Sequence, residues 1–279
     1  MINIASLAAD ALGDLLADEI NGTFGSSHRS IAEIVGSVAR VAIECISNSD
    51  ALYHNLEHTL LVTLVGRDIL RGRALTEHAV PADWAHFLIA CLMHDIGYVR
   101  GALKADGESG FVTDAAGTCV TLERGASDAA LEPWHVERSK LFVRERIGGI
   151  GFLDAERIAA AVEATRFPAK ADASEAGTEP ALVRAADLVG QLGDPHYLRK
   201  ANALYAEFSE NGLADKLGYQ SPADLVERYP EFFWKSVSPY LGPAIRYLNV
   251  TVSGRQWIAN LNSNIFCAER AMRLVGPQR

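Results

Sequence analysis

The sequence predicts an all-α fold in a single domain over residues 1–279. Most segments repeat apolar residues at helical spacing, and no stretch combines sustained strand alternation with hairpin turn residues. A chain of 279 residues is long enough for one large helical domain that buries most of its apolar surface. We expect a core at about 30–210 and a C-terminal helical extension at about 211–279.

Four helices are predicted in the first third of the chain. Their expected ranges are 3–20, 30–47, 53–71 and a segment that begins at Pro81. Ser30 is a suitable N-cap for the second helix, and Pro81 is suited to the first turn of the fourth. We expect the fourth helix to run through His94 and Asp95 until Gly97 ends it.

Glycines and polar residues interrupt any regular spacing of apolar residues over 99–131. We therefore expect a long loop there, with a short ribbon near Phe111–Leu122. Helical pattern returns at 135–147 and 154–165, and a second loop is expected at 168–180. Helices then follow over 180–210, broken near Pro195, and over 222–275, divided near Pro239 and Pro243.

Composition limits the class of protein. The 26 Lys+Arg against 35 Asp+Glu give a formal charge of -9, which argues against a protein that coats nucleic acid or anionic membranes. The four cysteines form no Cys-x-x-Cys pair, and the acidic first twenty residues do not resemble a secretory signal. No apolar stretch is long enough to cross a bilayer. We therefore expect a cytoplasmic protein with reduced thiols.

Histidines and aspartates form the most informative pattern. His54 and His58 are four residues apart, which would place them on one face of a helix, and His94 precedes Asp95 directly. Asp187 lies between apolar neighbours, where a carboxylate is costly to bury unless it is paired or bound to metal. Imidazole and carboxylate together suit divalent transition metals, so the sequence predicts a metal site.

The ordered motifs resemble a known family. The motif order is similar to that of the HD-domain superfamily of metal-dependent phosphohydrolases: a histidine, then His94-Asp95, then a distant aspartate. His54-Asn55-x-x-His58, followed by an apolar run to Val62, resembles the first signature of class I cyclic nucleotide phosphodiesterases. Ala185-Ala186-Asp187-Leu188 is similar to the segment around that family's last ligand. The motifs cover about residues 53–200.

The resemblance implies an HD-domain-like helical bundle and a set of roles. His58, His94, Asp95 and Asp187 would hold a divalent ion, Mn, Mg, Zn or Fe, and Asp95 would bridge to a second one. His54 would protonate the leaving oxygen after attack of a metal-bound hydroxide on a phosphoester. The expected substrate is a small phosphorylated molecule, most plausibly a nucleotide or cyclic nucleotide.

The sequence departs from the phosphodiesterase pattern at two positions. Leu61 stands where those enzymes have an aspartate, and Tyr98 stands where they have a further histidine. No counterpart of their purine-binding glutamine is found in the tail. Two alternatives therefore stay open, namely an HD-type di-iron oxygenase and a non-catalytic nucleotide-binding sensor.

Further residues are candidates for the site. His135 could contact a second metal or phosphate, or could equally cap a helix; it is included among the metal candidates. The substrate-binding candidates are Asn55, Gln191, Arg138 and Arg100. His86 is expected in the core, as are most tail aromatics. The N-terminal helix could serve a homodimer, or could equally pack within the chain.

Overall fold

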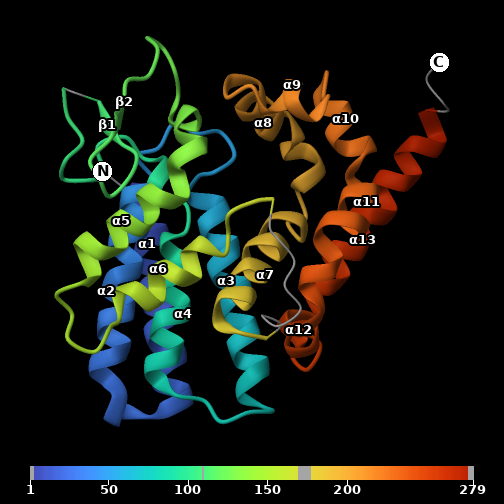
Figure 1. The fold of residues 1–279 in the computed structure, drawn as a ribbon. Helices are drawn as coiled ribbons and strands as arrows, with labels where there is room; N and C mark the ends of the chain where they lie inside the picture. The colour runs from blue at the N-terminus through green and yellow to red at the C-terminus, as the bar shows by residue number, and fades with distance from the viewer. Residues whose placement is uncertain (1–2, 109, 169–176, 276–279) are drawn as a thin grey trace.

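The computed structural model describes residues 3–108, 110–168 and 177–275. Helices account for nearly all of its regular structure, and the one sheet found among the described residues has two strands, which confirms the all-α prediction. Figure 1 shows upright helices from the first third of the chain beside a group of C-terminal helices.

The first four helices form the base of the bundle. They are α1 (Ile4–Phe24), α2 (Arg29–Ile46), α3 (Leu56–Ala74) and α4 (Pro81–Met93). α1 packs along α2, and α4 packs against both α2 and α3. All ten residues from Trp84 to Met93 in α4 are buried, so this helix lies in the centre of the core.

A long irregular segment follows α4, as the sequence predicts. It contains a 3-10 turn (Ile96–Tyr98), strands β1 (Phe111–Val112) and β2 (Cys119–Val120), and a second 3-10 segment (Asp128–Trp134). The two strands are antiparallel, with Phe111 opposite Val120. The predicted ribbon is therefore present, although it is very short.

The middle of the chain adds four helices. They are α5 (His135–Ile147), α6 (Ala155–Glu163), α7 (Glu179–Leu192) and α8 (Tyr197–Glu210). α7 packs against α3, and α6 packs against α4, α5 and α7. Pro195 separates α7 from α8, as predicted. Most of the loop predicted at 168–180 lies outside the described residues.

The C-terminal helices pack onto the bundle. They are α9 (Leu213–Leu217), α10 (Pro222–Glu227), α11 (Tyr229–Phe232), α12 (Ser238–Leu248) and α13 (Val252–Val275), with a π-helical turn at Phe233–Val237. α12 begins at Ser238 with Pro239 in its first turn, so the helix is divided near Pro239 as predicted, whereas Pro243 lies inside α12 and does not divide it. Trp234 is 57% exposed, but the other aromatics singled out in the tail are at least partly buried, which favours their expected core role: Phe232, Phe233, Tyr240, Tyr247 and Trp257.

A buried carboxylate attaches the tail to α3. Asp68 is 1% exposed and accepts hydrogen bonds from Trp257 Nε1 at 2.9 Å and from Ser253 Oγ at 3.1 Å. Arg67 donates to the same carboxylate. Because a buried carboxylate is costly without partners, these bonds specify where α13 lies on α3.

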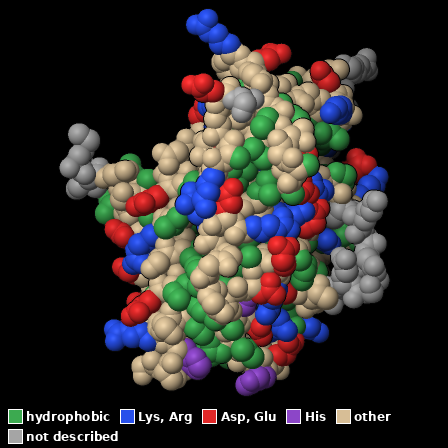
Figure 2. All heavy atoms as spheres, turned by 60° about the vertical axis from the view of Figure 1, so that its left-hand side comes forward, with side chains coloured by type: hydrophobic (Ala, Val, Ile, Leu, Met, Phe, Trp, Pro, Cys, Tyr) green, Lys and Arg blue, Asp and Glu red, His purple; other side chains and the backbone are tan. Residues whose placement is uncertain are grey.

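The surface carries charges of both signs. Figure 2 shows Lys and Arg side chains interspersed with Asp and Glu on the face in view, with no large patch of one sign there. None of the described helices is both long enough and apolar enough to span a bilayer. Cytoplasmic location and the possible homodimer stay predictions.

Candidate metal centre

Four predicted ligands come together from three helices. His58 lies in the first turn of α3, His94 and Asp95 follow the last residue of α4, and Asp187 lies in α7. The first three are buried, with at most 4% exposure, and their donor atoms all lie within 4.8 Å of one another. These three could hold a metal ion.

The distances between donor atoms suit a shared ion. His58 Nε2 lies 3.2 Å from His94 Nε2, 3.3 Å from Asp95 Oδ2 and 3.3 Å from Asp187 Oδ1. His94 Nε2 lies 3.1 Å from Asp95 Oδ2 and 3.6 Å from Asp187 Oδ1. Ligand bonds of about 2.0–2.2 Å place neighbouring donors about 3.3–3.6 Å apart in a tetrahedron. Asp187 therefore approaches both imidazoles at ligand spacing.

One carboxylate oxygen supports this assignment independently. Asp95 Oδ2 is buried and has no hydrogen-bond partner among the described residues. His94 Nδ1 donates to the carbonyl of Cys91 at 2.8 Å, which leaves Nε2 as a lone-pair donor toward the cluster. A buried carboxylate oxygen without a donor is costly, and a cation beside it would remove that cost.

The cluster is electrostatically suited to positive charge. Burial lowers the pKa of His58, but the carboxylates of Asp187 and Asp95 outweigh burial and raise it to about 10. Burial also raises the pKa of Asp95, but His94 and His58 hold it well below its usual range. The carboxylates of Asp95 and Asp187 favour a proton on His58, and a divalent cation bound between these groups would neutralise the same negative charge.

His54 lies beside the ligands with its own partner. The sequence places it in a helix, but α3 begins at Leu56, so His54 lies in the preceding loop. Its Nδ1 lies 2.6 Å from Glu207 Oε2, and Glu207 Oε1 accepts from the backbone N–H of His54 and of Tyr53. Burial lowers the pKa of His54, but the charge and hydrogen bond of Glu207 raise it overall.

Tyr98 lies between two histidines. Its ring stacks on His54, with centroids 4.7 Å apart, and on His135, with centroids 4.5 Å apart. His135 Nε2 lies 3.9 Å from Asp95 Oδ1, and its Nδ1 bonds to the carbonyl of Glu132. Burial lowers the pKa of His135, which favours the neutral ring that a metal requires. His135 therefore borders the cluster without joining the three mutually close ligands.

Two glycines allow the helices to approach closely. A Cβ on Gly190 of α7 would lie 2.8 Å from Val62 Cα in α3, and a Cβ on Gly97 would lie 1.9 Å from the carbonyl oxygen of His135. The first contact brings Asp187 toward His58, and the second brings His135 toward Asp95. Any larger residue at either position would push these elements apart.

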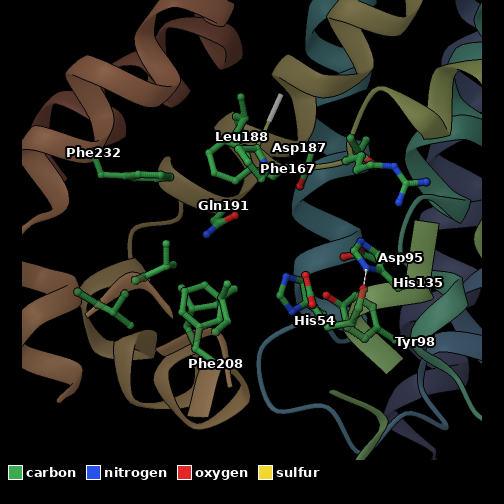
Figure 3. Close-up of a pocket in the computed structure, with 18 of the residues that line it drawn as sticks. His54, Asp95, Tyr98, His135, Phe167, Asp187, Leu188, Gln191, Phe208 and Phe232 are labelled. Atoms are coloured by element: carbon green, nitrogen blue, oxygen red, sulfur yellow. Dashed lines mark hydrogen bonds and ion pairs between the residues drawn. The ribbon is translucent and has the colours of Figure 1, made fainter. Parts of the chain in front are cut away.

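The cluster of His58, His94, Asp95 and Asp187 borders a cavity of about 250 Å³, into which Asp95 and Asp187 reach. His54, Asp95, Tyr98, His135 and Asp187 line one side of it. Figure 3 shows Phe208 and Phe232 on the opposite side and Gln191 between the two sides. Gln191 therefore lines the cavity, and its predicted role in binding substrate stays a prediction.

The structure corrects three of the predicted substrate-binding residues, and the first is Arg138. Arg138 is fully buried, and all its N–H donors are occupied by Asp106 and by the carbonyls of Gly97, Val99 and Val112. The side chain has no donor left for a substrate, and its role is to fix the loop after α4.

Arg100 is likewise engaged away from the cavity. Its guanidinium donates to Asp50 and Asp128 and to the carbonyl of Ala126. Arg100 is not among the residues that line the cavity. The substrate-binding prediction is therefore wrong for Arg100 too. Asp50 and Asp128 already bind its guanidinium, and the sequence gives no sign that these two acids lie next to it.

Asn55 and His86 have structural roles. Asn55 Oδ1 accepts from the backbone N–H groups of Glu57 and His58, so Asn55 caps α3 and fixes the turn that carries His58. This replaces its predicted contact with substrate. His86 bonds to the carbonyl of Ala82 and accepts from the backbone N–H of Asp154, which confirms the expected core role.

Glu207 and Tyr98 are site residues that the sequence does not identify as such. Glu207 is 3% exposed in α8, more than 150 residues after His54. Its sequence signal is weak, because a single glutamate in an amphipathic helix is usually solvated. Tyr98 is noticed only as a departure from a motif, and its stacking depends on the fold.

Comparison with known proteins identifies a family. A search of curated proteins found no match. The family model described as Npun_R2479-like matches residues 2–271, which is nearly the whole chain. The chain, with its His58–His94–Asp95 cluster, therefore belongs to the Npun_R2479-like family.

Proposed function

We propose that this protein is a metal-dependent phosphohydrolase of the HD-domain type. The observation that carries the proposal is the buried cluster of His58, His94 and Asp95, approached by Asp187, in which one carboxylate oxygen lacks a partner. The His54–Glu207 pair at the edge of the same cavity supports it, because hydrolysis also needs a proton donor.

His58, His94, Asp95 and Asp187 would hold the ion. When bound, it would activate water and withdraw charge from the phosphoryl oxygens. Asp95 Oδ1 and His135 Nε2 would hold a second, less completely liganded ion. The ligand types suit Mn, Zn or Fe, and Mg is a further possibility through the two carboxylates.

His54 would supply the proton. In hydrolysis the water oxygen forms a bond to phosphorus, and the bond from phosphorus to the ester oxygen breaks. The Nε2–H of protonated His54 would neutralise that oxygen, while Glu207 holds Nδ1 and fixes the orientation of the ring. A nucleotide or cyclic nucleotide is one substrate of this class and stays a prediction.

The test combines metal analysis with a substrate panel. Purified protein would be stripped with a chelator, reloaded with Mn, Mg, Zn or Fe, and assayed on phosphomonoesters, phosphodiesters and cyclic nucleotides. We expect ion-dependent hydrolysis that His94→Ala lowers more than the about 10–100-fold typical of a residue that only orients a ligand.

His78→Ala is the matched control, because His78 is exposed and lies outside the site. It should retain both metal and activity. Hydrolysis that survives both chelation and His94→Ala would refute the proposal. Oxygen consumption by the iron-loaded protein without hydrolysis would favour the oxygenase alternative, and nucleotide binding without turnover would favour the sensor.

A further inference from the structure

The cavity extends from the metal cluster to an apolar wall. Six side chains from the segment α8 to α11 form this wall, and we call them the apolar wall: Leu204, Phe208, Leu213, Leu217, Leu225 and Phe232. Figure 3 shows Phe208 and Phe232 facing the histidines across the cavity. Tyr197 and Tyr219 also line the cavity from this segment, so this side is mostly hydrocarbon with two hydroxyls, whereas His54, Asp95, His135 and Asp187 lie at the other end.

The wall is not explained by packing alone. Leu204 and Leu225 are buried, but Leu217, which also lines the cavity, is 49% exposed, and α9, which carries it, is only five residues long. A cavity of about 250 Å³ is many times larger than the space one water needs. Water against such a wall is unfavourable, so the wall favours an apolar occupant.

The arginines that line the cavity are already engaged. Among the described lining residues these are Arg166 and Arg184. Arg166 pairs with Glu163 and Glu137, and Arg184 Nε donates to the carbonyl of Ala164 at 2.7 Å. The described part of the cavity therefore suits one anionic group at the metal end better than a chain of phosphates.

We propose that the substrate is a phosphoester whose alcohol part is a hydrocarbon, with the phosphoryl group at the metal cluster and the hydrocarbon on the apolar wall. This inference rests on the proposed function. Among the described lining residues of α8 to α11, a nucleoside in the same position would meet the hydroxyls of Tyr197 and Tyr219 and otherwise hydrocarbon, so most of its nitrogen and oxygen atoms would be unpaired, which is costly on burial. Gln191, between the two ends, is placed to bond the ester oxygens.

Binding of phosphonates tests this inference without turnover. Calorimetry on the manganese-loaded protein would compare methylphosphonate, hexylphosphonate and adenosine 5′-monophosphate. Each carries a metal-binding anion, and they differ in what would reach the wall. We expect hexylphosphonate to bind at least about tenfold more tightly than methylphosphonate, and more tightly than the nucleotide.

Leu217→Glu tests the position of the hydrocarbon. Because Leu217 is half exposed, the substitution should preserve the fold while removing most of the hexyl preference, with methylphosphonate affinity unchanged. Leu75→Glu is the matched control, since Leu75 is 68% exposed and does not line the cavity. It should retain the full preference.

The outcomes separate the two proposals. Equal affinity for the two phosphonates, tighter binding of the nucleotide, or a hexyl preference unaffected by Leu217→Glu would overturn the inference. A hexyl preference that Leu217→Glu abolishes, in a protein that hydrolyses no phosphoester with any ion, would support the apolar site and overturn the proposed reaction.

Discussion

At the scale of single residues, the His54–Glu207 pair would set the pH range in which the proposed reaction has its proton donor. The Glu207 carboxylate raises the pKa of His54 above 6.5 against the effect of burial, and His54 in turn helps to lower the pKa of Glu207. The pair stabilises the fold fully between about pH 4.5 and about pH 6.5, and this contribution is lost as pH rises through the raised pKa of His54 or falls through the lowered pKa of Glu207. The raised pKa keeps His54 protonated to higher pH than an ordinary histidine.

Glu207→Gln should therefore alter the pH dependence of catalysis. Without the carboxylate, burial dominates and His54 loses its proton at lower pH, so the alkaline limb of the kcat profile should move toward acid. At pH 8 we expect kcat to fall by about tenfold or more, within the range that general acids contribute. The measurement is kcat from pH 5 to 9 with metal content determined in parallel.

Glu210→Gln is the control for this change. Glu210 lies in the same helix and bonds to Ser127, outside the cavity. Its profile should match that of the unmodified protein. A Glu207→Gln profile that is lowered equally at every pH would contradict the assigned role of the pair.

Arg138 shows how a single side chain fixes the loop beside the ligands. Its ion pair with Asp106 is buried on both sides, with side-chain exposures of 0% and 1%. Arg138→Met removes the partner of a buried carboxylate, so the free energy of unfolding should fall by about 3–5 kcal/mol. Urea unfolding measures this loss.

Arg29→Met is the matched control, since the pair of Arg29 with Glu33 is 75% and 67% exposed. It should leave the free energy of unfolding unchanged within error. A similar midpoint for both variants would show that the Arg138 network does not contribute to stability.

At the scale of elements, the contact of α7 with α3 delivers Asp187 to the cluster. Gly190→Ala would place a Cβ 2.8 Å from Val62 Cα, so α7 must move outward. We expect a loss of about 1–3 kcal/mol in the free energy of unfolding, together with weaker metal binding. Urea unfolding and metal titration measure the two effects.

Gly242→Ala is the corresponding control in α12, because a Cβ there meets nothing within 4 Å. Helix propensity predicts a gain of about 0.5–1 kcal/mol and no change in metal binding. If Gly190→Ala also keeps its metal affinity, the spacing of α7 and α3 does not govern the position of Asp187.

Sequence patterns predicted the helices better than the positions of their ends. Spacing alone suggested that His54 and His58 share a helix, yet Asn55 caps α3 between them. The side-chain oxygen of asparagine accepts hydrogen bonds from nearby backbone N–H groups. Asparagine therefore favours the N-cap position over the interior of a helix. The helix expected to include His94 and Asp95 ends at Met93, which lets both side chains turn toward the cluster.

At the scale of the whole molecule, the ion should stabilise the fold. Its proposed ligands come from α3, from the end of α4 and from α7, so an ion held there links three separate parts of the chain. Ion at 100 times its Kd would add about 2.7 kcal/mol, which raises Tm by roughly 5–10 °C for a chain of this size.

Thermal unfolding with and without a chelator, followed by addition of each ion, measures this effect. His94→Ala should unfold at the same temperature under all these conditions. An ion-dependent rise in Tm that persists in His94→Ala would place the bound ion elsewhere.

The sequence predicted the candidate metal centre because its members lie in short motifs of strong donors. It could not identify the surroundings, since these depend on distant segments that meet only in the fold. Glu207 reaches His54 from α8, and Asp50, Asp106 and Asp128 bind the two arginines that looked available for substrate. Paired charges of this kind carry no distinctive sequence pattern.

The two-ended cavity has a consequence for how this protein can change. The proposed ion ligands and His54 lie outside the segment α8 to α11, so substitutions of the apolar-wall residues can alter which molecule is accepted without touching them, as long as Glu207 of α8, the partner of His54, is kept. Such an arrangement permits substrate preference to diverge among family members, or to be reprogrammed in the laboratory, while the chemistry is inherited unchanged.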